Sequence, residues 1–147
     1  MNLELTLPPP ARAVGTYSMA VHAGGLVFLS GHGAFEDRRP IHTGRLGASL
    51  TTEQGARAAE AVMLGLLATV QDELGDLGRV ERFVKVVVFV SSTPAFTEQH
   101  LVANGATDLL VRVFGERGRP ARSAVGVAAL PLGFAVEIEA IVQVDDL

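Results

Sequence analysis

The sequence predicts an α+β fold of two layers, in which two helices pack on one face of a β-sheet. The expected elements follow the order β-β-α-β-α-β-β, and both helical stretches are amphipathic. A chain of 147 residues has the length of one domain with a single core. We therefore expect one domain over residues 1–147, with an extended N-terminal arm over residues 1–13 that contains three consecutive prolines.

The first half of the chain predicts a hairpin, a loop and a helix. Residues 18–22 and 26–30 flank a glycine-containing turn at 23–25, which is typical of two antiparallel strands. Residues 31–50 are rich in glycine and charge and predict a long loop with a short strand near Ile41. Thr51 and Gln54 have the spacing of a capping box, and the helix that they open ends at Gly75.

The second half predicts three strands and a helix. Residues 80–90 form a strand whose second half is apolar on both faces, which indicates a strand covered from both sides. Thr93 and Pro94 have the pattern of an N-cap and first helical residue, and the helix runs to Phe114 with a break or fresh start at Asn104-Gly105. A loop at 115–120 precedes a final hairpin of strands 123–128 and 135–144, joined by residues 129–134. Because helices cover only one face of this sheet, we expect a second copy of the chain to cover the other.

Composition argues against several classes of function. The chain has 12 basic and 16 acidic residues, a net charge of −4 and only 5% aromatic residues, which disfavours nucleic-acid binding. It has no cysteine, and its four histidines are too far apart for a local metal motif, so we expect no metal. The first residues lack the features of a secretory signal, and no run of about 18 apolar residues occurs. We therefore expect a soluble, cytoplasmic protein without a membrane partner.

The two C-terminal strands carry the candidate chemistry. Along residues 136–144 the apolar side chains alternate with Glu137 and Glu139, which share the other face. Pairing the apolar faces of the two strands would place Arg122 on the same face as both glutamates, with Ala124 and Gly126 as their small cross-strand neighbours. An arginine binds a carboxylate through two hydrogen bonds, and a half-buried glutamate can hold a water and move protons. A solvated ion pair without chemistry explains the same pattern.

Several segments resemble the RidA/YjgF/UK114 family. Ala121-Arg122-Ser123-Ala124-Val125, Leu130-Pro131 and Val136-Glu137-Ile138-Glu139-Ala140 resemble its C-terminal signature, and Gly15-Thr16-Tyr17 with Ser30-Gly31 resembles its first hairpin. The resemblance implies a chorismate-mutase-like (YjgF-like) fold and a homotrimer whose active sites lie in clefts between subunits. It also implies hydrolysis of reactive, carboxylate-bearing enamine and imine intermediates to keto acids and ammonia, without a cofactor.

The resemblance further implies roles for individual residues. Arg122 would bind the substrate carboxylate, and Glu137 would act on the hydrolytic water. The residues expected to line the cleft and bind substrate are Tyr17, Ser30, Gly31, His32, Asn104 and Ala124. For His32 two readings stay open: an imidazole that exchanges protons in the cleft, or a polar residue that ends a strand.

The chain departs from the family pattern at several positions. Thr16 stands where proline is usual, His32 where glutamine is common and Ala124 where cysteine is frequent. Residues 91–105 look longer than in the best-known deaminases, and residues 104–110 and 121–127 resemble an uncharacterised branch of the family. Besides deamination, two other functions stay open: a non-catalytic protein that binds or senses small carboxylates and, with less support, an endoribonuclease.

Overall fold

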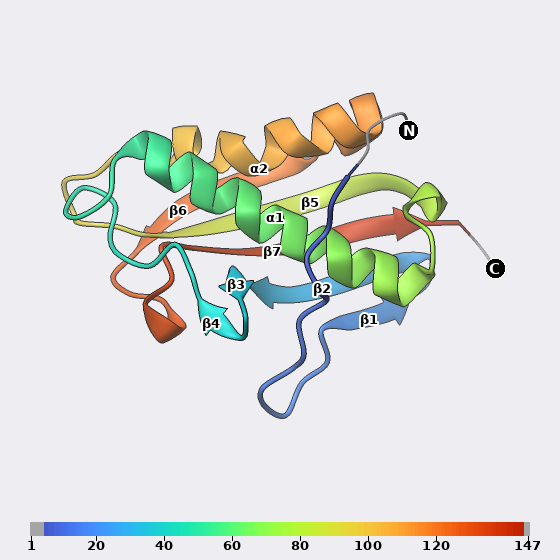
Figure 1. The fold of residues 1–147 in the computed structure, drawn as a ribbon. Coiled ribbons are helices and arrows are strands. Elements are labelled where there is room, and N and C mark those ends of the chain that lie inside the picture. The colour runs from blue at the N-terminus through green and yellow to red at the C-terminus, as the bar shows by residue number, and fades with distance from the viewer. Residues whose placement is uncertain (1–4, 146–147) are drawn as a thin grey trace.

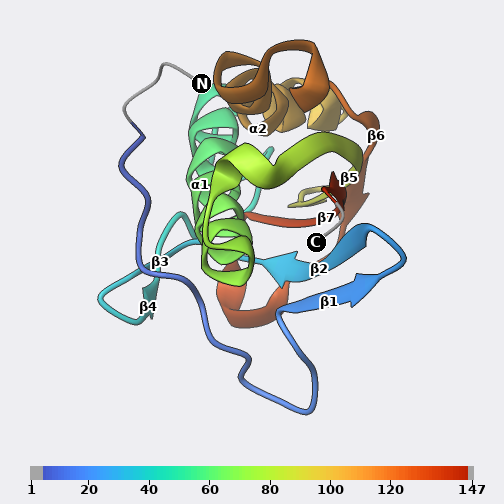
Figure 2. The same ribbon diagram turned by 90° about the vertical axis from the view of Figure 1, so that its right-hand side faces the viewer.

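Two helices pack side by side on one face of a five-stranded sheet (Figures 1 and 2), as the predicted α+β fold requires. The computed structural model describes residues 5–145. The helices are α1 (Thr52–Leu74) and α2 (Gln99–Phe114). The strand order across the sheet is β1 (Ala20–Ala23), β2 (Leu26–His32), β7 (Val136–Val144), β5 (Val80–Ser91) and β6 (Ala121–Val127). Within residues 5–145, no helix is long and apolar enough to cross a membrane.

The predicted long loop contains a small hairpin in place of a single strand near Ile41. Its strands are β3 (Phe35–Glu36) and β4 (Arg39–Pro40), which pair antiparallel. The two residues between them, Asp37 and Arg38, have positive φ angles of 50° and 65°. Two consecutive left-handed residues are typical of the tight turn that matches the twist of paired strands, so this turn makes the hairpin.

Helix α1 begins and ends where the sequence predicts. The Thr51 side chain accepts a hydrogen bond from the backbone N–H of Gln54, whose side chain accepts one from the Thr51 N–H. Gly75 ends the helix in the left-handed conformation that glycine adopts without strain.

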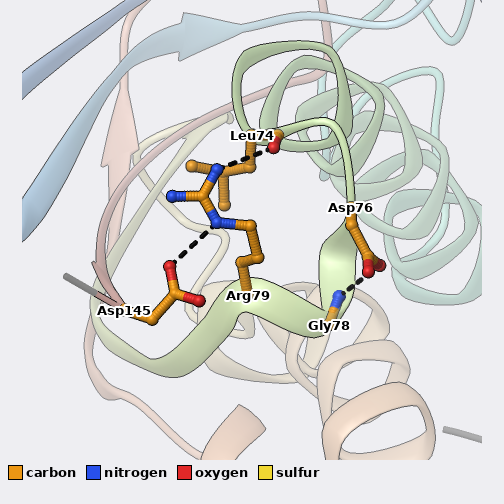
Figure 3. A network of polar contacts seen from close by, with 5 residues as sticks. All are labelled: Leu74, Asp76, Gly78, Arg79 and Asp145. Atoms are coloured by element: carbon orange, nitrogen blue, oxygen red, sulfur yellow. Dashed lines mark hydrogen bonds and ion pairs between the residues drawn. The ribbon is translucent and has the colours of Figure 1, made fainter. Parts of the chain in front are cut away.

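A polar network then ties the end of α1 to the C-terminal end of β7 (Figure 3). Arg79, in the short turn η1 (Leu77–Arg79), donates to the Leu74 carbonyl at 2.9 Å and to the Asp145 carboxylate at 2.8 Å. The Asp76 carboxylate accepts from the Gly78 N–H and caps the same turn.

The predicted helix start at Thr93-Pro94 is wrong. The N–H of Thr93 donates to the carbonyl of Leu46, and the N–H of Phe96 donates to the carbonyl of Thr93, so these residues form a turn held by a distant loop. Helix α2 starts only at Gln99, with Glu98 as an N-cap that makes no side-chain cap bond. Tertiary hydrogen bonds therefore override a favourable local pattern.

The predicted break at Asn104-Gly105 is also wrong, because α2 runs through both residues without interruption. A Cβ atom at Gly105 would collide with the backbone carbonyl of Ala56 in α1. This glycine therefore lets the two helices approach each other closely and does not mark a helix end.

The predicted final hairpin does not form. Strand β6 pairs with β5 in parallel at the edge of the sheet, and β7 lies between β2 and β5, antiparallel to both. A strand, a helix and a parallel strand form the usual crossover unit, and β5, α2 and β6 follow that pattern. The links before and after β6 contain the short helical turns η2 (Gly115–Gly118) and η3 (Pro131–Gly133).

The sheet face turned away from the helices is open and apolar. The middle of β5 is apolar on both sides, as predicted: Val86, Val88 and Val90 are fully buried under the helices, whereas Val87 and Phe89 are half-buried on the other face. Further apolar side chains share that open face: Val21, Phe28, Val125 and Ile141. No element within residues 5–145 covers this face.

Candidate functional site

Arg122 lies on edge strand β6 and reaches toward α2. Its Nη1 donates to Asn104 Oδ1 at 2.7 Å and to Thr107 Oγ1 at 3.1 Å, and its Nη2 donates to the His100 carbonyl at 3.3 Å. Asn104 and Thr107 are three residues apart on one face of α2, so the helix presents both acceptors together. All three acceptors are neutral, and the guanidinium forms no ion pair with any residue between 5 and 145.

A groove opens beside this guanidinium. It has a volume of about 270 Å³ and is lined by Asn104, Thr107, Asp108, Val111, Arg119, Pro120 and Arg122. We call it the Arg122 groove. A guanidinium has five N–H donors, and three of these are engaged by the described residues, so the Nε–H and one Nη2–H have no partner among residues 5–145.

Glu137 lies in the central strand β7. Its Cα partner across the sheet is Phe89, whose own partner on β6 is Val125, so all three side chains share the open face. The carboxyl group rests against the backbone of Gly31: a Cβ there would lie 2.6 Å from Glu137 Oε2. Burial, with a smaller contribution from the charge of Glu139, raises the pKa of Glu137 above its ordinary value. A raised pKa suits a carboxyl group that must both accept and return a proton.

The predicted placement of Arg122 beside Glu137 is wrong for a single chain. Arg122 is the Cα partner of Val86, which is fully buried under the helices, whereas Glu137 lies on the open face. The alternation within each strand is as expected, but β6 and β7 are not neighbours, so the two sets of side chains point to opposite faces.

The space predicted above Ala124 and Gly126 is also largely filled. Ala124 packs against the core on the Arg122 side of the sheet, and a Cβ at Gly126 would lie 2.7 Å from Ser92 Oγ and 2.8 Å from Gln99 Nε2. The free volume near Arg122 therefore lies toward Asn104 and Arg119 and not above Gly126.

The remaining predicted site residues lie in three separate places. Ser30 and Gly31 form a bulge at the end of β2 beside Glu137, where the Ser30 hydroxyl donates to the Ser18 carbonyl at 2.6 Å. Tyr17 is half exposed, and its hydroxyl accepts from the Val14 N–H at 3.4 Å, with no recorded contact to Arg122 or Glu137. His32 does not face the open side: it is 2% exposed and lies beneath α1.

Sequence reasoning missed several groups of the Arg122 groove. Thr107 holds the guanidinium together with Asn104, and Asp108 and Arg119 line the groove. The spacing of Asn104 and Thr107 is a signal that could have identified the first of these, once the helix was expected to run through Gly105. No group of three or more histidine, aspartate and glutamate side chains within the described part of the chain could hold a metal ion.

Several known proteins are similar to this chain in sequence, in fold or in both. A family model described as Endoribonuclease L-PSP matches residues 9–144. Protein TCP17 of Trypanosoma cruzi is 48% identical over 146 residues, which cover 99% of this chain and 91% of that protein. The 2-iminobutanoate/2-iminopropanoate deaminase of Dermatophagoides farinae is 28% identical over 146 residues, with coverage of 96% and 95%. The crystal structure of Atu1372 from Agrobacterium tumefaciens, a protein described as of unknown function, has a TM-score of 0.90 at 42% identity, and the match covers 96% of this chain and 87% of that one.

Proposed function

Because the chain belongs to the RidA/YjgF family of Endoribonuclease L-PSP proteins, we propose that it hydrolyses small, carboxylate-bearing enamines and imines to keto acids and ammonia. The observation that carries the proposal is the Arg122 groove, in which a guanidinium held by neutral acceptors keeps two donors for a ligand carboxylate. The similarity to a 2-iminobutanoate/2-iminopropanoate deaminase supports this substrate class.

The complete site requires two copies of the chain. Arg122 and Glu137 lie on opposite faces of the sheet, two strand positions apart and three residues apart along the strands, which is about 10 Å in each of these two directions. A second copy seated on the open apolar face would bring its Arg122 groove to the Glu137 of the first and would bury that face. Any closed ring satisfies every chain equally, and the family resemblance implies three copies, so we propose a homotrimer with its sites between neighbouring chains.

In this arrangement each residue has one task. Arg122 holds the substrate carboxylate and thereby fixes the position of the adjacent imine carbon. Glu137, as carboxylate, takes a proton from the attacking water, whose oxygen bonds to the carbon of the protonated imine while the C=N electron pair moves to the nitrogen. Glu137 then gives this proton to the amine nitrogen of the tetrahedral intermediate, and the C–N bond breaks as the hydroxyl proton passes back to Glu137. The keto acid leaves with ammonia, which takes that proton as ammonium.

Ammonia release from 2-aminoacrylate generated in situ tests the proposal. Loss of a buried, charge-assisted contact costs on the order of 2–5 kcal/mol, so Arg122→Ala should lower kcat/KM at least about tenfold. Arg112→Ala is the matched control, because Arg112 lies on α2, the helix that also holds the Arg122 guanidinium, but only forms an exposed ion pair with Glu60. An Arg122→Ala protein that releases ammonia at the unaltered rate would overturn the proposal.

A non-catalytic carboxylate-binding protein would use the same groove. It would show no ammonia release, while small keto acids would raise the Tm of the unaltered chain and not of Arg122→Ala. Endoribonuclease activity has no supporting site: the chain carries a net charge of −4 with one lysine, Lys85, which lies on the open sheet face.

A further inference from the structure

His32 is buried between α1 and the sheet with both ring nitrogens engaged. Nδ1 lies 2.6 Å from the carbonyl oxygen of Ser30, and Nε2 lies 2.8 Å from Thr69 Oγ1 on α1. A carbonyl oxygen only accepts, so Nδ1 must carry the hydrogen. In the neutral ring Nε2 then accepts from the Thr69 hydroxyl at 2.8 Å, which is closer than the Gly65 carbonyl at 3.4 Å, so this hydroxyl holds the second nitrogen of a ring whose tautomer the Ser30 carbonyl fixes.

The Ser30 carbonyl belongs to the bulge on which Glu137 rests. The register between β2 and β7 shifts between Leu29 and His32, and this irregularity contains Ser30 and Gly31. Gly31 has no side chain there, because a Cβ would lie 2.6 Å from Oε2 and 2.8 Å from Cδ of Glu137. The bare backbone at Gly31 is therefore the surface that contacts the carboxyl group and excludes water from one side of it.

These contacts form one path through the sheet, from Thr69 on α1 through His32 and the Ser30-Gly31 backbone to Glu137. We propose that His32 is a positioning residue for Glu137, which holds the bulge from beneath and so fixes the place of the carboxyl group on the open face. The catalytic importance of this placement rests on the proposed function, but the placement itself can be measured without a substrate.

An ordinary core histidine would contribute to stability alone, and its replacement would leave Glu137 unaffected. Burial lowers the pKa of His32, with the Ser30 carbonyl acting in the opposite direction, so the ring is neutral at pH 7. Its proposed part in the site is therefore to orient a peptide group. Burial beneath α1 favours the second of the two readings that the sequence left open, a polar residue that ends a strand.

The test follows the titration of the Glu137 carboxyl carbon by NMR in the intact protein. Thr69→Val removes the hydroxyl that holds Nε2, and Thr69→Ser keeps it. His32→Leu removes both ring contacts, and His32→Gln keeps one donor and one acceptor. We expect the Glu137 titration to move down toward that of an ordinary glutamate in Thr69→Val and His32→Leu. It should stay in place in Thr69→Ser and His32→Gln, and in the control His22→Gln, whose ring is exposed and paired with Glu73.

Kinetics on an imine substrate provides a second readout. Misplacement of a catalytic group by a residue outside the site costs up to about a hundredfold, so kcat should fall roughly tenfold to a hundredfold in His32→Leu. KM should stay unchanged, because Arg122 holds the substrate on the other half of the site.

The outcomes separate the two proposals. If Glu137 titrates identically in Thr69→Val and Thr69→Ser, the positioning role is disproved, whatever the protein catalyses. If the titration moves as expected but no imine is hydrolysed, the proposed function fails and the positioning role stands. Should His32→Leu not fold, the two Thr69 variants decide the question alone, because both keep a side chain of nearly the same size.

Discussion

Glu137 combines an unfavourable position for a charge with a position on the proposed active face. Since burial and the neighbouring Glu139 raise its pKa, the folded chain binds a proton here more tightly than the unfolded chain does. Linkage then requires that stability decreases as the pH rises from the ordinary glutamate value through the raised one. The carboxylate form at neutral pH is therefore kept at a cost in stability.

Replacement of Glu137 by glutamine should stabilise the protein while it abolishes turnover. Above the raised pKa the free energy of unfolding of Glu137→Gln should exceed that of the unaltered chain, because the amide carries no charge. Well below the ordinary pKa both carry no charge and the difference should vanish. Urea unfolding at about pH 3 and pH 8 measures this, with Glu81→Gln on the exposed end of β5 as control. Equal stability of the two chains at pH 8 would contradict the expectation.

The sequence predicts which residues share a face of a strand better than it predicts where that face lies in the folded chain. Alternation correctly groups Arg122 with Ala124, and Glu137 with Glu139, because side chains alternate along any strand. It cannot tell which face of the sheet each group occupies, since that depends on which strands are neighbours. The resemblance named His32 as a cleft residue, whereas its contact with Thr69, 37 positions away, depends on how α1 lies on the sheet.

Among the elements, the contact between α1 and α2 depends on Gly105. A Cβ at this position would meet a backbone carbonyl of Ala56, which cannot rotate away as a side chain can. The two helices must then move apart, and overpacking of this kind costs typically about 1–3 kcal/mol.

Gly105→Ala should therefore destabilise the protein by about 1–3 kcal/mol in urea unfolding, although alanine favours a helix more than glycine does. Gly65→Ala is the matched control: it lies within α1, and its Cβ would approach only the Gly33 carbonyl, at 4.0 Å. Without a clash, this change should increase stability by up to about 1 kcal/mol. A Gly105→Ala protein as stable as Gly65→Ala would show that the helices have room.

The boundaries of a helix or strand are well predicted where they depend on residues that are close in the sequence. Thr51, Gln54 and Gly75 act within their own helix, so their pattern holds in the folded chain. Thr93-Pro94 has an equally good pattern, but its backbone binds Leu46, which is distant in sequence. Pairing of β6 with β5 is likewise non-local, and the prediction of a final hairpin came from adjacency in the chain alone.

For the whole molecule, the separation of Arg122 from Glu137 can be tested by mixing two chains that each lack one of the two groups. Arg122→Ala keeps Glu137, and Glu137→Gln keeps Arg122, so a site between one of each has both groups. In a closed ring assembled from equal amounts, about one quarter of the sites should be complete. Co-refolding the two variants should restore roughly that share of ammonia release, whereas each variant refolded alone should keep only its own residual rate. Recovery that is absent from mixed oligomers would place both groups in a single chain.

The sequence predicts that a second copy of the chain covers the sheet, because Val87 and Phe89 are apolar on the side away from the helices. The structure identifies the rest of that face, including Phe28 and Val125, which lie on strands far apart in the chain. The arrangement of the copies cannot be predicted from the sequence pattern, because alternation within a strand does not depend on which surface of a second chain packs against it.

The position of Asn104-Gly105 inside α2 also affects the rate at which Asn104 deamidates. An asparagine followed by glycine deamidates readily when the next backbone nitrogen is free to attack the side-chain carbonyl, and asparagine is accordingly among the thermolabile residues. Helical geometry holds that nitrogen away, and the amide oxygen is held by Arg122 at 2.7 Å. Each unfolding event releases this restraint, and an aspartate formed there would neutralise the guanidinium on refolding. Heat damage at this position would accordingly remove the proposed anion binding irreversibly in molecules that are otherwise correctly folded.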